Sequence, residues 1–233
     1  NGINIVSKAI PSRTTMSILE CILIDADAGE IKLTGNDMEL GIETKVEGSI
    51  LERGKIALEA KLFYEIIRKL PDGDTPVTIT SDNRFNTVIE CENAVFNIQG
   101  RDGEEFSYLP YIERDQHISL TQFTLKEAIR QTIFSISPND SNKMMAGELL
   151  EVKDDFLKVV SLDGHRISIR NIQLKEHYDN HKVIVPGKTL SEISKILTGD
   201  NEKEVLIYFS KNHILFEFDD TVVGSRLADG EDF

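Results

Sequence analysis

An internal repeat with a constant spacing of 127 residues constrains the fold of this chain more than any other feature. Asp102–Phe106 (DGEEF) returns as Asp229–Phe233 (DGEDF), and Glu65-Ile66 returns as Glu192-Ile193. Two further matches at the same spacing lie nearer the start of each copy. One spacing shared by several separate places indicates two copies of one structural unit. The repeat therefore predicts two domains of ordinary size, residues 1–111 and 112–233.

The starts of the two copies differ. In the second copy, residues 116–121 favour a strand, and Thr124 and Glu127 have the spacing of a capping box at the start of a helix. The first copy begins directly on the apolar helical stripe of Ile3, Val6 and Ile10. We therefore expect an N-terminus that is cropped by about one strand and part of a helix. Because the chain stops where the next connector would begin, we also expect that a third unit is absent.

The pattern of short apolar runs and turn residues predicts an α+β fold, in which each unit packs two helices on antiparallel sheets. Asp154-Asp155, Lys211-Asn212 and Asp219-Asp220 are predicted turns between neighbouring strands. In the first unit we expect strands near 17–25, 30–35, 38–47, 55–60, 77–81, 85–91 and 94–99, with a helix at 61–70. In the second we expect strands near 147–153, 156–162, 166–174, 181–185, 204–209, 213–218 and 221–226, with a helix at 188–197.

Positive charge gathers on the predicted helices although the whole chain is acidic. The formal net charge is −14 at pH 7, which by itself disfavours binding to a polyanion. The four helical segments nevertheless carry five net positive charges together, so the remaining chain holds nineteen net negative ones. Lysine and arginine are good helix formers on solvated faces, which explains part of this segregation. The other explanation is that the helices face a polyanion while the sheets repel one.

Composition disfavours disulfide-stabilised proteins and membrane proteins. Cys21 and Cys91 cannot form a disulfide framework, and two buried, reduced thiols are typical of a cytosolic protein. No apolar run approaches the roughly 20 residues that cross a bilayer, so we expect no membrane association.

Metal and nucleotide sites also find little support. His177 and His181 are spaced like half a zinc site, but no second Cys or His pair accompanies them, so a polar loop is the better interpretation. Asp25, Asp27 and Glu30 resemble part of a calcium loop, yet predicted strands flank them and favour a hairpin turn. No glycine loop for a nucleotide and no nucleophile elbow occur. We expect no metal and no cofactor.

Four segments together resemble the bacterial DNA polymerase III beta subunit, the beta sliding clamp. Val160–Ile167 (VSLDGHRI) is similar to the family's Asp-Gly-His-Arg segment, and Ala60–Gly73 is similar to the helix of its first domain. Val183–Lys188 resembles the strand-to-helix entry of its second domain, and Ser225–Gly230 the end of that domain. The resemblance covers essentially the whole chain, and its segments follow one another in the family's order.

The resemblance implies a binding protein rather than an enzyme. Subunits of this family have three similar domains, and two subunits close head to tail into a ring. Helices line the hole, duplex DNA passes through it without sequence preference, and the ring slides along. Implied partners are the replicative polymerase subunit, the clamp loader, other proteins with clamp-binding motifs, and a second copy of the full-length protein.

The resemblance also implies three sets of site residues. The hydrophobic pocket that takes partner peptides would include Met145, Leu162, Gly164, His165, Arg166 and Ile167. An edge strand that joins the partner subunit would carry Val95, Phe96 and Ile98. Together with basic residues of the predicted helices, the candidate DNA-contacting set is Arg13, Lys61, Arg68, Lys126, Arg130, Asn139, Lys143, Met144, Lys188 and Lys195.

Two other classes of function remain open. An enzyme with a cleft between two repeated domains would need a convergent set of titratable residues, and the sequence supplies none that we can assemble. At Asp163–Arg166, a turn between strands explains the residues without any chemistry. A scaffold that binds only proteins is the second alternative, against which the basic helices and Arg13 weigh. Salt-dependent binding to duplex DNA would separate it from a clamp.

Overall fold

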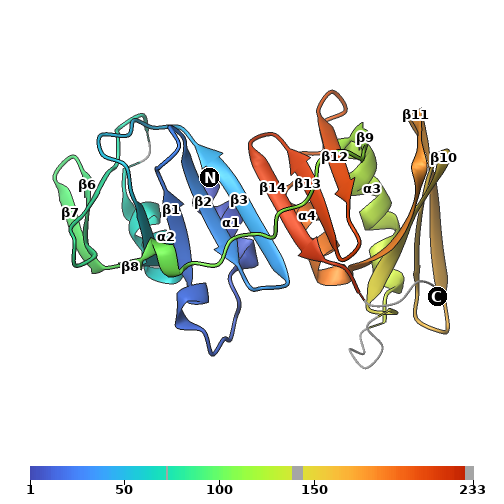
Figure 1. Ribbon diagram of the computed structural model, residues 1–233, viewed down its shortest axis with the longest axis horizontal. Helices are drawn as coiled ribbons and strands as arrows, with labels where there is room; N and C mark the ends of the chain where they lie inside the picture. The colour runs from blue at the N-terminus through green and yellow to red at the C-terminus, as the bar shows by residue number, and fades with distance from the viewer. Residues whose placement is uncertain (72, 138–143, 229–233) are drawn as a thin grey trace. The chain divides into compact units, whose positions relative to one another are not determined.

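The computed structural model describes residues 1–71, 73–137 and 144–228, which fall into two compact units divided between Leu109 and Pro110 (Figure 1). The predicted boundary, after residue 111, lies two residues later. Each unit combines antiparallel sheets with two α-helices, so the predicted α+β fold class is confirmed. Among the described residues, no helix has both the length and the hydropathy to cross a bilayer.

The first unit contains a larger and a smaller antiparallel sheet. In the larger sheet, neighbouring strands pair in the order β8-β4-β1-β2-β3, and in the smaller one the order is β5-β6-β7. The strands are β1 Cys21–Asp25, β2 Ile31–Asn36, β3 Leu40–Val46, β4 Lys55–Glu59, β5 Thr78–Ser81, β6 Asn86–Cys91, β7 Ala94–Gln99 and β8 Arg101–Asp102. The helices are α1 Gly2–Val6 and α2 Ala60–Lys69, with the 3₁₀ turns η1 Ser7–Ala9, η2 Ser17–Glu20 and η3 Gly103–Glu105.

The second unit pairs a four-stranded sheet with a long two-stranded ribbon. The sheet has the order β14-β13-β12-β9, and the ribbon consists of β10 and β11. The strands are β9 His117–Thr121, β10 Gly147–Leu162, β11 Ile167–Pro186, β12 Glu204–Phe209, β13 His213–Phe218 and β14 Thr221–Arg226. The helices are α3 Gln122–Thr132, the 3₁₀ turn η4 Ile133–Ser135, and α4 Gly187–Ile196. Helix α3 packs against β10, β11 and α4.

The ribbon repeats the strand pairing of the first unit. The half of β10 from Gly147 to Val152 pairs with the end of β11, as β1 pairs with β4. The other half of β10, from Phe156 to Leu162, pairs with the start of β11, as β2 pairs with β3. The spacing of 127 residues therefore relates secondary structure as well as sequence.

Three details of the sequence analysis were wrong. Four strands were expected between 147 and 185, whereas the structure has two long ones; the predicted turn at Asp154-Asp155 is a register shift inside β10, with Asp154 at φ 55°. Helix α3 begins before Thr124, and its N-cap is Thr121, whose hydroxyl accepts a hydrogen bond from the Thr124 amide at 3.1 Å. The helical period of residues 61–70 predicts Leu62 in the core, but its side chain is 41% exposed.

The core of each unit lies between its helices and sheets. Phe63 and Ile66 of α2 are buried, as are Leu190 and Ile193 of α4. These side chains recur at one face of each helix because residues three and four apart point the same way. Fully burying such a side chain contributes about 1.5–3 kcal/mol, so the inner faces fix both helices and leave their polar faces outside.

Candidate nucleic-acid interface and partner pocket

Basic side chains occupy equivalent places on the outer faces of α2 and α4. Lys61 and Arg68 are exposed on α2, and Lys188 and Lys195 are exposed on α4. The repeat spacing of 127 residues relates Lys61 to Lys188 and Arg68 to Lys195. Seven residues separate the members of each pair, which is nearly two helical turns and places them on one face about 10 Å apart. Each unit therefore presents the same two cationic positions.

Helix α3 carries two further candidates, and both already have protein partners. The Lys126 ammonium donates to the carbonyl oxygen of Leu197, just after α4, at 2.8 Å. Arg130 forms two hydrogen bonds with the carboxylate of Glu127, at 2.9 and 2.7 Å. The hydrogen bond from Arg130 is the largest influence that lowers the pKa of Glu127, and this carboxylate offsets the positive charge beside it. The charge of α3 is therefore weaker than its sequence suggests.

The remaining DNA candidates lie outside the helices. Arg13 is exposed in the segment between η1 and η2. Met144 is partly buried and packs against the apolar cluster of Leu149, Val160 and Ile184. Asn139 and Lys143 lie outside the described residues.

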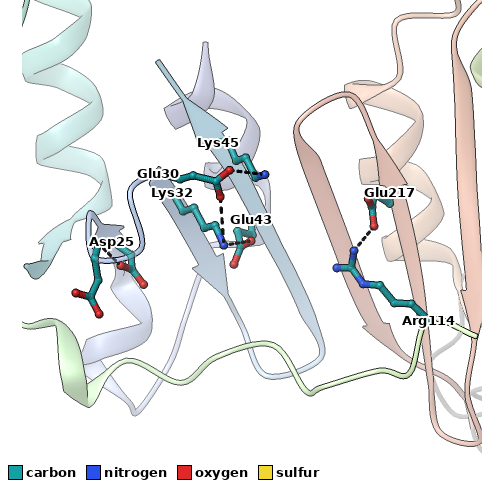
Figure 2. A network of polar contacts seen from close by, with 8 residues as sticks. Asp25, Glu30, Lys32, Glu43, Lys45, Arg114 and Glu217 are labelled. Carbon is teal, nitrogen blue, oxygen red and sulfur yellow. Dashed lines mark hydrogen bonds and ion pairs between the residues drawn. The ribbon is translucent and has the colours of Figure 1, made fainter. Parts of the chain in front are cut away.

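Several lysines on the strands are paired with acidic side chains. Figure 2 shows Lys45 beside Glu30, with Nζ 2.9 Å from Oε1, and Lys32 beside Glu30 and Glu43, at 3.9 and 3.8 Å. Side-chain hydrogen bonding from Lys45 is the largest influence that lowers the pKa of Glu30. In the second unit, Arg114 pairs with Glu217 of β13 at 2.5 Å. Such pairs offset the positive charge of the strand lysines. Lys61 and Arg68, by contrast, lie on an exposed helix face.

The predicted partner pocket centres on the tight turn between β10 and β11. Asp163 organises this turn, because its carboxylate accepts hydrogen bonds from the amides of His165 and Arg166 at 3.0 and 3.1 Å. These contacts, the His165 amide first, lower the pKa of Asp163. Gly164 has φ 87°, a left-handed conformation that glycine adopts without strain. The turn leaves Ile167 59% exposed at the start of β11.

Two exposed apolar side chains beside this turn were missed by sequence analysis. Phe134 of η4 is 59% exposed, and the Arg166 guanidinium carbon lies 6.0 Å from the centre of its ring. Ile169 is 55% exposed and follows Ile167 by two residues, on the same face of β11. Phe134 falls outside the apolar stripe of the preceding helix, and this position was the available signal.

Backbone and hydroxyl contacts connect the pocket residues to η4. The hydroxyls of Ser135 and Ser168 are 2.6 Å apart, which ties η4 to β11. The Ser137 amide donates to the carbonyl oxygen of Met145 at 2.7 Å. The structure therefore joins the segment containing Met145 to the hairpin that carries Arg166 and Ile167. Leu162, the last residue of β10, is partly buried.

The candidate subunit edge is β7, which pairs with β6 alone among the described strands. Its side chains alternate between the two faces of the sheet. Val95 is 55% exposed, whereas Phe96 and Ile98 lie on the opposite face and are half-buried. The strand thus combines an open hydrogen-bonding edge with one exposed apolar side chain.

The residues that we rejected as ligands have ordinary roles. The predicted polar loop for His177 and His181 was wrong, because both residues lie within strand β11. The ring of His181 stacks on Phe209, with centroids 4.4 Å apart, and burial lowers its pKa. The Asp27 amide donates to the Asp25 carboxylate at 3.1 Å within the β1–β2 turn. Among the described residues, no group of three or more His, Cys, Asp or Glu side chains could hold a metal ion.

Comparisons with known proteins agree across the chain. Residues 1–110 match the family described as DNA polymerase III beta subunit, N-terminal domain, and residues 119–232 match its central domain. Proteins named beta sliding clamp from Staphylococcus epidermidis and Halalkalibacterium halodurans are each 36% identical over 99% of this chain. The chain spans 62% and 63% of those two proteins, respectively.

Solved structures give the same result. A putative DNA polymerase III beta subunit from Eubacterium rectale is 65% identical, with a TM-score of 0.97, and the Bacillus subtilis sliding clamp is 34% identical, with a TM-score of 0.94. The sliding clamp of Pseudomonas aeruginosa, solved with griselimycin bound, is 25% identical, with a TM-score of 0.92. All of this chain and 63% of each structure are covered. This chain therefore belongs to the DNA polymerase III beta subunit family, the beta sliding clamps.

Proposed function

We propose that this chain forms part of a DNA sliding clamp that encircles duplex DNA in the bacterial cytoplasm and tethers replication proteins to it. The repeated cationic pairs, Lys61 with Arg68 and Lys188 with Lys195, support the proposal most directly. Two equivalent helices with the same spacing of charge suit a regular polyanion. Contacts of this kind reach phosphates and carry no base-sequence information.

The proposal includes a full-length protein that closes head to tail with a second copy, using the edge of β7. It assigns no chemical reaction to the chain. The proposed partners at the pocket are the replicative polymerase subunit, the clamp loader and other proteins with clamp-binding motifs. The exposed apolar side chains of Phe134 and Ile167 support a docking role at that place. Because a clamp of the family is solved with griselimycin, we also propose that griselimycin binds this pocket.

A topology experiment on the full-length gene product tests encirclement. The protein is loaded onto nicked circular DNA with a clamp loader, and its retention is measured before and after the circle is cut. A ring is lost from linear DNA because it slides off the ends. Equal retention on circular and linear DNA would overturn encirclement and indicate ordinary surface binding.

A second experiment addresses the helices. Replacing Lys61 and Lys188 together by glutamine should weaken duplex binding. It should also reduce the salt dependence of binding, because fewer phosphate contacts release fewer counterions from the DNA. Unchanged binding would remove the basis for placing α2 and α4 against DNA. Salt-independent behaviour of the unaltered protein would favour the alternative of a scaffold that binds proteins alone.

A further inference from the structure

Glu148 is a carboxylic acid in the core of the second unit. It is the second residue of β10 and is 0% exposed, on the same face of the strand as the buried Leu150 and Val152. Its Oε1 atom has no hydrogen-bond partner in the part of the chain that the structure describes. Its Oε2 atom lies 3.0 Å from the hydroxyl oxygen of Thr132. An ionised carboxylate buried with so few hydrogen-bond donors costs free energy, because it has lost its hydration.

The single hydrogen of the Thr132 hydroxyl indicates which protonation state of Glu148 fits the contact between the two side chains. The Thr132 hydroxyl has a single hydrogen and lies 2.7 Å from the carbonyl oxygen of Ala128, which can only accept. If that hydrogen goes to Ala128, the contact with Glu148 needs a hydrogen from Glu148 itself. The neutral acid supplies this hydrogen, and the carboxylate cannot. Burial also raises the pKa of Glu148 from 4.5 to about 8, which favours the neutral form.

The charged groups of the elements around Glu148 are engaged elsewhere or exposed. Burial is the largest influence on its pKa and raises it. A hydrogen bond donated by the Thr132 hydroxyl lowers it, and the Ala128 carbonyl oxygen competes for that same hydrogen. The side chains of Lys182, Arg170 and Lys188 are exposed. The remaining nearby charges of α3, α4 and β10 have the following contacts: Glu127 with Arg130, Lys126 with the Leu197 carbonyl, Glu192 with Lys195, and Glu151 with Lys158.

Glu148 lies at the joint that positions the candidate partner pocket. Thr132 is the last residue of α3, and its carbonyl oxygen accepts a hydrogen bond from the buried hydroxyl of Ser161 on the other half of β10. Phe134 follows Thr132 by two residues, and Met145 precedes Glu148 by three. The two segments that carry these pocket residues therefore begin beside the contacts that Thr132 and Glu148 make.

We propose that Glu148 is a protonation switch for the partner pocket, holding the end of α3 against β10 as a neutral acid and releasing this joint when it ionises. The proposal deepens the function proposed above and rests on it for the role of the pocket. On ionisation the proton passes to solvent, and no bond between heavy atoms changes. The buried charge left behind has one hydroxyl partner, whose hydrogen it must share with Ala128.

The direction of the pH effect follows from the raised pKa. Between about pH 4.5 and about pH 8 the folded protein holds a proton on Glu148 that the unfolded chain has released. Stability from the neutral acid is therefore complete below this interval and is lost progressively as the pH rises through it. Above about pH 8 the loss is complete and the curve levels off.

Hydrogen exchange on the whole chain, from about pH 6 to about pH 9, tests the joint. The amides of Ser137 and Gly147 donate to the carbonyl oxygens of Met145 and Met144, so they report its opening. After correction for intrinsic exchange rates, we expect their protection to fall with rising pH in the unaltered protein. Glu148→Gln, which stays neutral and can donate to Thr132, should remove this dependence. Equal dependence in both proteins would overturn the proposal.

Glu151→Gln is the matched control, because it removes a carboxylate three residues further along β10 that is partly exposed and paired with Lys158 at 3.3 Å. This variant should keep the pH dependence of the unaltered protein. If Glu148→Gln does not fold, carboxyl carbon NMR titrates Glu148 directly in the unaltered chain. A pKa near the ordinary value of 4.5 would overturn the proposal.

Griselimycin binding separates the switch from the proposed function. With labelled griselimycin as the probe, affinity should fall several-fold over the same pH range in the unaltered protein and stay constant in Glu148→Gln. An equal fall in both would overturn the coupling between Glu148 and the pocket. If griselimycin binds at no pH, its placement in the pocket fails, and the exchange of Ser137 and Gly147 still decides whether Glu148 controls the joint.

Discussion

Arg130 donates two hydrogen bonds to the carboxylate of Glu127, three residues earlier on α3, with Nε 2.9 Å from Oε1 and Nη2 2.7 Å from Oε2. Helix α4 repeats the relationship, since Lys195 lies 2.7 Å from Glu192 at the same separation. In both helices a carboxylate offsets the cation before any phosphate approaches. Weak, screened contacts would suit the proposed sliding along DNA, because strong ones would hold the protein in place.

Replacing Glu127 by glutamine should therefore strengthen duplex binding. The Arg130 charge would no longer be offset, and an exposed ion pair is weak, so the gain in affinity should be about fivefold at most. Fluorescence anisotropy with a labelled duplex, repeated over a series of salt concentrations, measures both the gain and its screening. Glu151→Gln removes the same charge from the Glu151–Lys158 pair on β10 and serves as the control. An equal gain in both variants would show that only net charge matters.

Replacing Arg68 by glutamine should weaken duplex binding without reference to sequence. Arg68 is exposed in the last turn of α2, at the position equivalent to Lys195. Losing one phosphate contact should reduce the slope of log affinity against log salt by about one. Arg84 lies exposed in the turn between β5 and β6, so Arg84→Gln makes the same change of charge away from the helices. Matching salt slopes for the two variants would contradict the assignment of α2 to the DNA face.

The repeat allowed most elements of the fold to be predicted. A strand or helix identified in one copy supports its equivalent in the other, so residues 85–91 and 213–218 strengthened each other. Within the ribbon this help failed at Asp154-Asp155, because turn residues mark a change of backbone direction without showing whether the strand continues. Leu62 follows the helical period of α2 but falls at the edge of its apolar face, where the period alone cannot separate buried from exposed.

The candidate site was less predictable than the fold. Sequence identifies Lys126 and Arg130 as cations, yet only coordinates show that one donates to the Leu197 carbonyl and the other to Glu127. Glu148 was missed because a glutamate near the start of a strand is ordinarily solvated. The available signal was its spacing from Leu150 and Val152, because residues two apart on a strand share a face and these two are apolar.

Replacing Ile167 by serine should weaken griselimycin binding and leave stability almost unchanged. The side chain is 59% exposed, so the protein loses little burial, whereas a bound ligand would lose an apolar contact. Val95→Ser on β7 removes a similarly exposed side chain, at 55%, from the proposed subunit edge. It should reduce self-association of the full-length protein and leave griselimycin binding intact. Titration and sedimentation on both variants check this crossed design, and identical effects of the two changes would contradict separate sites.

Replacing Thr121 by alanine should destabilise the second unit more than replacing Thr124. The Thr121 hydroxyl accepts from the Thr124 amide at 3.1 Å, one of the donors that a helix N-terminus leaves without an intrahelical partner. Losing such a cap costs about 0.5–2 kcal/mol of unfolding free energy. Thr124→Ala removes only a hydroxyl contact with Thr121, at 2.8 Å, and should cost less.

Urea unfolding, followed by circular dichroism, compares these variants. Thr121→Ser keeps an accepting hydroxyl at the same position and should retain most of the stability that alanine loses. A greater loss for Thr124→Ala than for Thr121→Ala would restore Thr124 as the start of α3. The expected order instead follows from the backbone. Helix α3 begins at Gln122, directly after Thr121, and the third residue after a cap brings its amide, here that of Thr124, to the cap hydroxyl.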